Sequence, residues 1–516
     1  MNIIMNTKSA RRLFVILSLL TFHFSLFISV AHAQSQFNEK PKLVVGIVVD
    51  QMRWDYLDRY YEKFTDGGFR RLIEKGYSCN NCLINYVPTI TAIGHTSAYT
   101  GSTPAFHGIC GNSFYIDGKK VTSCQDDAVQ AVGSETKSGN RSPRNMLSTT
   151  IGDQLRLHTD FQSKVVGVSY KDRAAIFPAG HSANAAYWLD SKRLCFITST
   201  YYMQELPSYV KRVNNELKHN QEAKKAGDRI GFSPVCGTII TDMAIAALHG
   251  EKLGKGKYTD MLCVSYSQTD VIGHEWGTRG SHTDEAYLQL DKDVARLLRA
   301  LDAQVGSGNY IVFLTADHGA AHNWNYLRDN HISASGPFDF GDINPQLDSI
   351  LKAELGTTRE VIADVLDYRI ILNRDFISQQ GLDIAKVKQV LVNAFMKIDH
   401  VSNVVDYETA AVAPIPERLR SQILMGYHPR RTGDIIIIPE PQYYSWWKGG
   451  PATATTHGEW NPYDAHIPCL FMGWHIPHGA TSREVHITDI APTICQLLHI
   501  QQPNTCVGEA IPEITK

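Results

Sequence analysis

Aspartates and histidines recur along this chain in short motifs whose residue types suit a metal site. Asp270 and His274, in SQTDVIGHEWG, stand four positions apart, and on a helix this spacing turns both side chains to one face. Asp317 and His318 are adjacent in LTADHGA. Alone, each motif also fits surface polar residues or a turn, but six such groups together suit two zinc ions with positions left for a substrate. The candidate ligands are Asp50, Asp270, His274, Asp317, His318 and His457.

A hydroxyl group for nucleophilic chemistry occurs in the stretch NYVPTITAIGHTSAYTG, residues 85–101. Pro88 favours a turn, and the segment after it could begin a helix at or near Thr91. A threonine at a helix N-terminus is most often a cap. Bound to zinc, however, its hydroxyl would lose a proton near neutral pH and become a nucleophile.

The elements that must position these groups begin with four apolar runs rich in β-branched residues. They lack strict alternation, as strands covered on both faces do, and helical patterns such as residues 285–302 lie between them. This order predicts an α/β fold with a mostly parallel sheet flanked by helices, in which sites gather beyond the carboxyl ends of the strands. Asp50, Asp270 and Asp317 each follow a predicted strand. The four runs are residues 42–50, 163–170, 260–266 and 308–319.

The chain is too long for a single hydrophobic core, and its pattern of predicted helices and strands changes between residues 326 and 450. There YRIILN, DIAKVKQVLVNAFMKI, VSNVVDY and GDIIIIPEP predict a small α+β subdomain inserted into the main fold. The catalytic core would then consist of residues 34–325 and 451–516. In the second part HIPCLFMG predicts a strand and TDIAPTICQLL a helix.

The first 33 residues have the layout of a signal peptide, with Lys8, Arg11 and Arg12 before an apolar stretch and Ala-His-Ala at the end. An uncleaved membrane anchor is the alternative. We expect cleavage after Ala33 and a periplasmic or secreted protein. No second apolar stretch is long enough for a bilayer, so we expect no membrane association after cleavage.

Charge and cysteine content narrow the range of partners. Lys plus Arg total 50 and Asp plus Glu 52, so no charge excess indicates a nucleic-acid surface. Ten cysteines follow the predicted cleavage site, where disulfides would persist, but their pairing cannot be derived from the sequence. Cys79 and Cys82 form a lone C-x-x-C, which we interpret as structural thiols or a disulfide.

Taken in order, Asp50, PTITAIGH, HGICGN, SYKDR, TDVIGH, ADHG and TTHGEW resemble the alkaline phosphatase superfamily, and within it the PafA-type phosphate-irrepressible alkaline phosphatases. The resemblance runs from Asp50 to the DIAPTICQLL segment. It implies that Asp50, Asp317 and His318 hold one zinc ion. It implies that Asp270, His274 and His457 hold the other.

The family nucleophile lies in a Thr-x-x-x-His pattern, which Thr91 and His95 match. Thr89 is the alternative, and we interpret His95 as structural. The implied reaction is in-line displacement between two zinc ions about 4 Å apart, with a phosphothreonine intermediate that water then hydrolyses. Metal ions take most of the charge, so no general base is required from the protein.

Lys171 and Arg173 indicate which phosphate ester is the substrate. In an extended segment these two residues would face the same side and could hold one dianionic phosphoryl group. A Lys-x-Arg pair and an asparagine, here Asn112, have this role in PafA-type enzymes, whereas nucleotide pyrophosphatases lack the two cations. The resemblance therefore implies hydrolysis of small-molecule phosphate monoesters. A solvated surface turn is the alternative reading of the pair.

The sequence also bears on three other functions. A sulfatase is disfavoured, because the chain has no Cys/Ser-x-Pro-x-Arg motif. A phosphodiesterase or nucleotide pyrophosphatase of the same superfamily stays open, as does a non-catalytic secreted protein that holds zinc. The sequence gives no oligomeric state.

Overall fold

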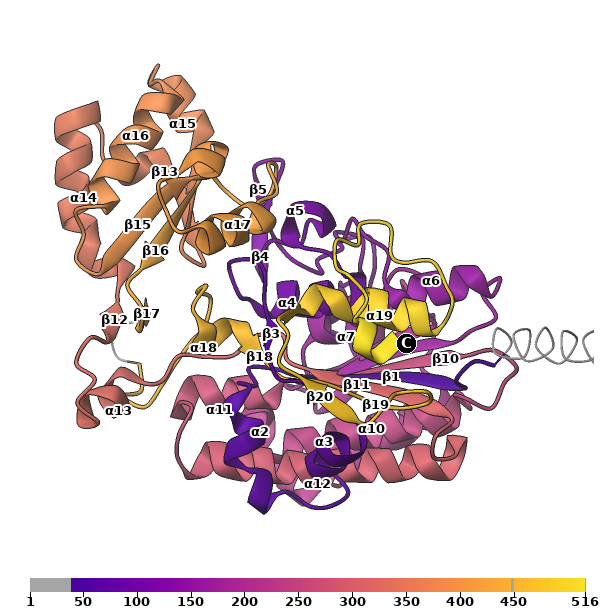
Figure 1. The fold of residues 1–516 in the computed structure, drawn as a ribbon. Helices are drawn as coiled ribbons and strands as arrows, with labels where there is room; N and C mark the ends of the chain where they lie inside the picture. Colours follow the sequence, from indigo (N-terminus) through magenta and orange to yellow (C-terminus); the bar gives the residue numbers. More distant parts are fainter. Residues whose placement is uncertain (1–38, 447–449, 516) are drawn as a thin grey trace, which may run out of the picture. The chain divides into compact units, whose positions relative to one another are not determined.

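The computed structural model describes residues 39–446 and 450–515, except for the side chains of residues 341 and 342. The predicted signal peptide, residues 1–33, lies outside the described residues. The described chain from Lys42 onward forms one compact unit, which contains a ten-stranded sheet (Figure 1). In spatial order its strands are β20 (Gly479–Thr481), β2 (Tyr77–Cys79), β19 (Cys469–Gly473), β11 (Tyr310–Thr315), β1 (Leu43–Val49), β10 (Asp260–Tyr266), β7 (Val165–Ser169), β8 (Ala185–Asp190), β9 (Cys195–Ser199) and β6 (Ala131–Val132).

The centre of this sheet is parallel and its edges are not. The five strands from β11 to β8 run in one direction, which confirms the four strands predicted from apolar runs. Antiparallel strands flank them on both sides, with β19 beside β11 and β9 beside β8, so the sheet is mixed. Because β1, β10 and β11 are neighbours in register, the residues that follow them emerge at one edge.

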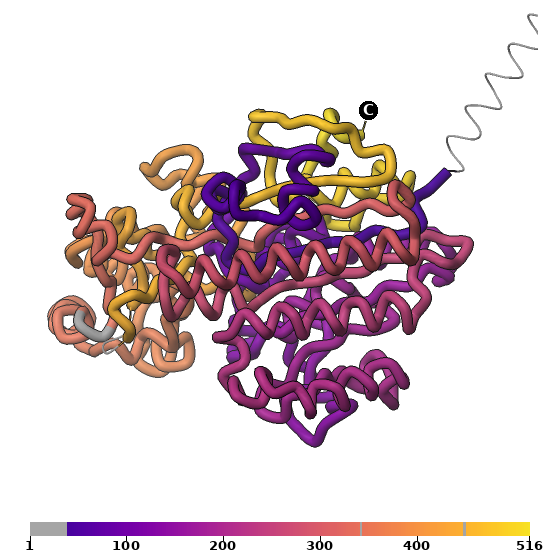
Figure 2. The backbone as a smooth tube through the Cα atoms, turned by 90° about the horizontal axis from the view of Figure 1, so that it is seen from below, coloured from indigo at the N-terminus to yellow at the C-terminus, as the bar shows by residue number. Residues whose placement is uncertain are grey.

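Helices cover both faces of the sheet (Figure 1). On one face lie α4 (Thr91–Thr100), α7 (Asp172–Ala179) and α19 (Ile490–Leu497). On the other lie α10 (Val235–Gly250) and α12 (Ser281–Val305), and Figure 2 shows α12 crossing that face. The helix predicted over residues 285–302 falls within α12. The two layers bury both faces of the central strands.

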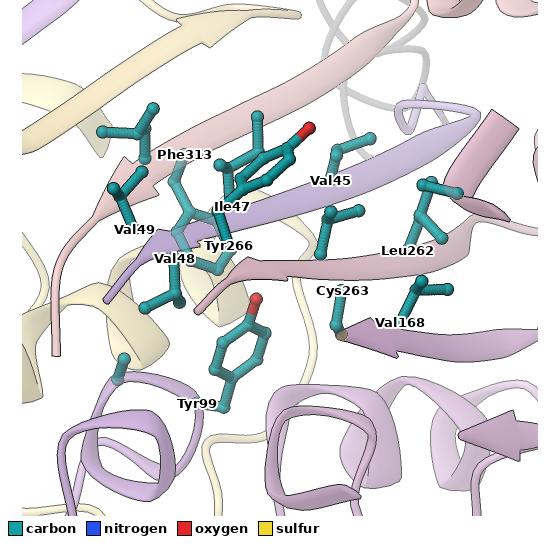
Figure 3. Packing of buried hydrophobic residues seen from close by; sticks show 14 of the residues in the cluster. Val45, Ile47, Val48, Val49, Tyr99, Val168, Leu262, Cys263, Tyr266 and Phe313 are labelled. Carbon is teal, nitrogen blue, oxygen red and sulfur yellow. The ribbon is translucent and has the colours of Figure 1, made fainter. Parts of the chain in front are cut away.

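The packing of α4 on the sheet depends on one glycine in β1. Every residue of β1 is buried, and a Cβ at Gly46 would lie 2.2 Å from the hydroxyl of Tyr99 and 2.5 Å from Phe313. The missing side chain lets the Tyr99 ring of α4 reach the sheet, where its centroid lies 5.4 Å from that of Phe313 (Figure 3). Complete burial of residues such as Val45 and Ile47 contributes about 1.5–3 kcal/mol each. This core fixes α4 against the strand ends.

A second, four-stranded antiparallel sheet lies between β11 and β19 in the chain. Two helices, α14 (Phe340–Leu355) and α16 (Ile384–Phe395), pack on it around a separate apolar cluster. A further helix, α17 (Glu417–Gly426), lies with Val87 in another cluster. Strands and a helix occur where the four motifs of the insertion predicted them; the boundaries at 326 and 450 stay a prediction. The strand order is β13 (Ile362–Leu366), β14 (Arg369–Leu372), β16 (Ile435–Pro439) and β15 (Val401–Asp406).

Shorter elements complete the described chain. Among the described residues no single helix is long and apolar enough to cross a bilayer, although Gln221–Phe232 and Val235–Gly250, bent by 101°, meet the length and composition requirement as a pair. All ten cysteines are free thiols, including Cys79 and Cys82. The remaining α-helices and strands are α2 (Asp55–Arg59), α3 (Phe69–Lys75), β3 (Cys82–Leu83), α5 (Pro104–His107), β4 (Ser113–Ile116), β5 (Lys119–Thr122), α6 (Ile151–His158), α8 (Ser208–Leu217), α9 (Gln221–Ala226), α11 (Gln268–Trp276), α13 (Trp324–Asp329), β12 (Gly336–Phe338), α15 (Arg374–Gln379), β17 (Tyr443–Ser445), α18 (Pro462–Ala465), β18 (His466–Ile467), β21 (Val485–His486) and α20 (Pro512–Thr515).

Candidate metal centre and nucleophile

Two aspartates reach the centre of the site from the ends of neighbouring strands. Asp50 directly follows β1, and its backbone N–H donates to the carbonyl oxygen of Tyr266 at 3.0 Å. Asp317 follows β11 by two residues, and both carboxylates are fully buried. The backbone N–H of Gln51 donates to Asp317 Oδ1 at 3.1 Å, which ties the two strand ends together.

The helix α11 supplies a second pair, as the Asp-x-x-x-His spacing predicted. Asp270 Oδ1 lies 3.1 Å from His274 Nε2 one turn later, and 3.6 Å from His457 Nε2. One ligand atom from each of these three residues lies within 4.8 Å of the others, so they could hold one metal ion. The His457 ring stacks on His318 with centroids 3.5 Å apart, which places the two predicted ligand sets side by side.

His318 Nε2 is the meeting point of the other predicted set. It lies 3.6 Å from Asp50 Oδ1, 3.4 Å from Asp317 Oδ2 and 3.4 Å from Thr91 Oγ1. Asp270 also belongs here, because one atom each from Asp50, Asp270 and His318 lies within 4.8 Å of the others. The structure thus brings all six predicted ligands into one cluster, with Asp270 between the two sets.

Backbone carbonyl groups fix which ring nitrogen of the three histidines faces the cluster. Each Nδ1 faces a carbonyl oxygen, which can only accept, so each Nδ1 carries a proton and Nε2 is the nitrogen left to bind a metal. Such outer contacts commonly orient metal ligands. The contacts are His274 Nδ1 to Thr455 O at 2.9 Å, His318 Nδ1 to Gly319 O at 3.0 Å, and His457 Nδ1 to Thr89 O at 2.7 Å.

Two buried carboxylate oxygens support a cation at this point. Among the described residues, Asp50 Oδ1 and Asp317 Oδ2 have no hydrogen-bond partner, although both atoms face His318 Nε2. A buried acceptor without a donor is costly, and a metal ion would satisfy both oxygens at once. Oxygen and imidazole donors in this ratio fit zinc.

Lys171 lies between acids of the two ligand sets. Its Nζ donates to Asp50 Oδ2 at 2.7 Å and to Asp270 Oδ2 at 2.6 Å. The prediction that Lys171 and Arg173 share one side of an extended segment is wrong, because α7 begins at Asp172. The Arg173 guanidinium instead lies 3.5 Å from the Asp172 carboxylate. Helical geometry rotates successive side chains by about 100°, so the two cations do not lie side by side as predicted.

The electrostatic environment of the cluster shifts the pKa values of Asp50 and Asp270 in opposite directions. Burial raises the pKa of Asp50 well above its ordinary value, and the neighbouring Asp317 carboxylate raises it further. Burial also raises the pKa of Asp270, but His274 and Lys171 outweigh that effect and hold it well below its usual range. Burial lowers the pKa of Lys171, yet Asp270 and Asp50 raise it overall, so the ammonium stays charged.

Among the other groups, burial opposes ionisation of Asp317, but His318 and His95 more than offset it and its pKa lies below the usual range. Burial lowers the pKa of His318 and lowers that of His457 well below 6.5, with His318 as a further cause for His457. His274 differs, because burial lowers its pKa but the Asp270 carboxylate raises it overall. His318 and His457 thus favour the neutral form that a divalent cation requires of an imidazole ligand.

Thr91 is the first residue of α4, whose N-cap is Ile90, so the threonine hydroxyl is not the cap. Its Oγ1 faces His318, whereas the hydroxyl of Thr89 donates to the carbonyl oxygen of Glu459 at 2.9 Å. Asn112 lies beside Thr91, because its Oδ1 accepts from the backbone N–H of Ala92 at 3.2 Å. The geometry supports Thr91 over Thr89 as the nucleophile.

His95 has the contacts expected of a structural residue. Its Nδ1 lies 2.9 Å from the carbonyl oxygen of Thr91 and 3.2 Å from Asp317 Oδ2, and its Nε2 lies 2.7 Å from the hydroxyl of Ser265. It therefore ties the first turn of α4 to the ends of β10 and β11.

Sequence reasoning missed Gln51. Its Nε2 donates to Asp270 Oδ1 at 2.7 Å, and its backbone has a φ of 65° in the left-handed region. A signal was present in the α11 motif, where a Cβ at Gly273 would lie 1.9 Å from Gln51 Oε1. The glycine before His274 thus leaves room for this side chain.

The fold is an α/β sheet covered by helices on both faces, and the side chains gathered at the ends of its central strands are suited to bind metal ions. The sequence model of the type I phosphodiesterase / nucleotide pyrophosphatase family matches residues 44–463. The chain belongs to this family and, within it, to the PafA-type alkaline phosphatases, which hydrolyse phosphate monoesters.

Named relatives support that assignment. The chain is 40% identical to alkaline phosphatase PafA of Elizabethkingia meningoseptica, over 92% of this chain and 94% of the relative. The crystal structure of wild-type PafA matches with a TM-score of 0.88, covering 93% of this chain and 99% of that one. A protein of Myroides odoratus named calcium-transporting ATPase is 43% identical, over 94% of this chain and 97% of the relative.

Proposed function

We propose that this alkaline phosphatase uses two zinc ions per chain and forms a phosphothreonine on Thr91. The observation that carries the proposal is the position of Thr91 Oγ1, 3.4 Å from His318 Nε2 at the N-terminus of α4. The hydroxyl therefore borders a cluster of buried carboxylates and imidazoles, and the first peptide N–H groups of the helix favour negative charge beside it.

In this proposal Asp50, Asp317 and His318 hold one zinc ion, and Asp270, His274 and His457 hold the other. When bound, the ions lower the pKa of a neighbouring hydroxyl and neutralise charge on the phosphoryl oxygens. The donors fit that role, because Nδ1 of each histidine is held by a carbonyl oxygen, which leaves Nε2 for a metal, and Asp50 Oδ1 has no hydrogen-bond partner among the described residues.

The chain's own residues then account for the two displacements. Thr91 Oγ1 loses its proton and attacks the phosphorus atom, and the ester oxygen leaves with the bonding electron pair and takes up a proton as the free alcohol. Water then loses a proton and attacks the phosphothreonine, the bond to Oγ1 breaks, Oγ1 takes up a proton to regenerate the threonine hydroxyl, and inorganic phosphate is released. His95 holds the carbonyl group of Thr91, so the nucleophile keeps one position through both steps.

Asn112 and the two cations would hold the phosphoryl group. Asn112 Oδ1 accepts from Ala92 N–H, which places the amide group beside the first turn of α4, and no described residue accepts from its Nδ2 donor. Lys171 brings positive charge between the two ligand sets, and Arg173 lies close enough for its charge to lower the Lys171 pKa. A dianionic monoester end benefits more from this charge than a diester does.

Small-molecule phosphate monoesters are therefore the substrate class we propose, with the periplasm or the exterior as the compartment. The terminal phosphoryl group of ATP has the same dianionic end, so ATP hydrolysis, which the name of the Myroides relative suggests for that protein, would use the same reaction. A diesterase, which the family name includes, is the competing activity.

The decisive experiment replaces Thr91 with alanine. We expect Thr91→Ala to abolish chelator-sensitive hydrolysis of p-nitrophenyl phosphate while zinc content, measured by mass spectrometry, stays near that of the parent. Thr89→Val is the matched control and should retain activity, because the Thr89 hydroxyl serves the backbone of Glu459. Full activity of Thr91→Ala would exclude the threonine intermediate, and a zinc-loaded parent without turnover would favour a non-catalytic role.

The substrate class is tested with the two cations. Lys171→Ala combined with Arg173→Ala should reduce kcat/KM far more for p-nitrophenyl phosphate than for bis-p-nitrophenyl phosphate, by about 100-fold in relative terms, because each charge-assisted contact contributes about 1.5–3 kcal/mol. Equal losses on both substrates would refute the assignment. A parent that prefers the diester would place the enzyme among the diesterases.

A further inference from the structure

The hairpin of β13 and β14 has a strained tip directed at the active-site loops. A two-residue turn, Asp367–Tyr368, joins the strands, with φ values of 48° and 65°. Turns with two positive φ angles favour Asn-Gly or Asp-Gly, and a tyrosine in that conformation is uncommon. Such strain persists where surrounding contacts determine the conformation, often near functional sites.

Arg369, the residue after this turn, is 1% exposed. Its guanidinium group contacts the segment that precedes Asn112. Its Nη1 donates to the carbonyl oxygen of Cys110, its Nη2 to Asp367 Oδ2 at 2.8 Å, and its Nε to the carbonyl oxygen of Leu366 at 3.1 Å. A Cβ at Gly111 would lie 2.8 Å from Nη2, so the guanidinium packs directly on the peptide before Asn112.

A second arginine of the same segment holds the same loop. Arg431 Nη1 donates to the carbonyl oxygens of Gly108 at 2.8 Å and Asn145 at 2.6 Å. The Thr432 hydroxyl lies 3.3 Å from Cys110 Sγ. Residues 108–110 are therefore held from the side of the inserted sheet, while Asn112 is held from the other side by the N–H of the residue after Thr91.

The tip also touches the loop of a predicted metal ligand. A Cβ at Gly458, the residue after His457, would lie 3.3 Å from Tyr368 Cε2 and 3.6 Å from Ile90 Cδ1. The Tyr368 hydroxyl accepts from the backbone N–H of Ser445 at 2.6 Å, which fixes the ring in place. One buried tip thus contacts the loops of Asn112 and His457.

We propose that Arg369 is a positioning residue, which with Asp367 sets the place of the Asn112 amide for the phosphoryl group. The inference rests on the proposed function, in which Asn112 donates to a phosphoryl oxygen. Arg369 touches neither substrate nor metal; it acts through the carbonyl oxygen of Cys110, two residues before Asn112. A loose loop would let the Nδ2 donor move away from Thr91 and weaken transition-state binding.

A double-mutant cycle tests this coupling. We expect Arg369→Gln to lower kcat/KM for p-nitrophenyl phosphate about tenfold in the parent and less than about twofold in an Asn112→Ala background, because residues of one hydrogen-bonded network are not additive. Asp367→Asn is the milder variant, since asparagine tolerates a positive φ, and it should show the same pattern with about a threefold effect in the parent.

The control is Lys388→Gln in α16, the helix that packs on the same inserted sheet. Lys388 is a buried cation paired with Asp406 and Glu408 at 3.1 and 2.8 Å, and no described residue of 108–112 contacts it. It should lower the melting temperature without changing kcat/KM. Equal losses from Arg369→Gln in both backgrounds, or no loss in the parent, would overturn the inference alone. An Asn112→Ala variant with full activity would instead refute the role of Asn112 in the proposed function, and the inference with it.

Discussion

The two carboxylate oxygens of Asp270 have different partners. Oδ2 accepts from Lys171 at 2.6 Å, while Oδ1 accepts from Gln51 at 2.7 Å and lies 3.1 Å from His274 Nε2. Lys171 and Gln51, which are not predicted ligands themselves, thus orient the carboxylate of the predicted ligand Asp270. Contacts of this kind raise metal affinity, because they fix the carboxylate before the ion binds.

Gln51→Met therefore should weaken zinc binding. Methionine has a similar volume but cannot donate to Asp270, so the carboxylate loses a fixed position, and we expect zinc affinity to fall about 10–100-fold. Competition with a chromophoric chelator measures the change. Gln304→Met is the control, because Gln304 donates to the carbonyl groups of Leu248 and Leu253, away from the site. Unchanged affinity in Gln51→Met would contradict the assigned role.

Local spacing was enough to predict residues that the fold brings together. Asp270 and His274 share a helical face, and acids after parallel strands must meet at one edge of the sheet. Gln51 was missed because its role depends on a left-handed backbone and on a contact 219 residues away. The predicted side-by-side placement of Lys171 and Arg173 was wrong for a related reason. The short stretch from Lys171 to Arg173 does not by itself show whether a helix or an extended turn begins there, and the structure has a helix from Asp172.

At the scale of elements, the position of Thr91, the proposed nucleophile, depends on how closely α4 approaches β11. A Cβ at Gly94 would lie 2.2 Å from the carbonyl oxygen of Asp317 and 2.6 Å from its Cα, so the helix contacts the strand end directly. Any separation of these two elements would move Thr91 and Asp317 apart. Since both groups face His318, the distance between the elements controls the geometry of the centre.

Gly94→Ala should therefore reduce turnover strongly. The added methyl group forces α4 away from the Asp317 backbone, and we expect kcat to fall about 100-fold, as for a misplacement of about 1 Å. Overpacking should also cost about 1–3 kcal/mol of stability. Gly152→Ala in α6 is matched, because its Cβ would meet Val165 at 2.9 Å far from the predicted ligands, and it should lose stability but keep kcat. Equal kcat values for the two variants would show that the approach of α4 is not critical.

Strands were predictable where apolar runs are long and fully buried, as in β1, β7, β10 and β11. The edge strands β6 and β20, and β2 beside β20, have only two or three residues, and their existence depends on partners distant in the chain. β8 and β9 were missed although both are buried, because a sequence does not state which strand pairs with which. Pairing is a non-local property, so the mixed edges could not be derived locally.

At the scale of the whole molecule, acid sensitivity follows from histidines buried without charge. Burial lowers the pKa of His107 from 6.5 to about 3, and nearby His428 lowers it further. His107 lies between Ser97, whose hydroxyl is 3.1 Å from Nε2, and Ile109, whose N–H donates to Nδ1. Burial likewise lowers the pKa of His322 to about 3. At acidic pH these two histidines therefore bind protons in the unfolded chain and stay neutral in the folded protein.

The direction of the pH effect follows from that difference. Above pH 6.5 His107 is neutral in both states, so it adds no pH dependence. As the pH falls from 6.5 toward 3, only the unfolded chain gains the proton, and the free energy of unfolding falls by about 1.4 kcal/mol per pH unit for this one group. The loss is complete once the pH reaches the folded-state pKa of about 3.

His107→Gln should remove this part of the acid sensitivity. Glutamine can still accept from Ile109 N–H, so we expect the variant to be less stable than the parent at pH 7.5 but to lose about 2 kcal/mol less between pH 6.5 and pH 5. Urea unfolding at these pH values measures the difference. The predicted ligand histidines contribute to the pH dependence of both proteins, so their contribution cancels in this difference. His219→Gln, at an exposed position in the turn after α8, should leave the slope unchanged. Parallel pH curves for the parent and His107→Gln would mean that His107 is not the buried neutral group that drives acid unfolding.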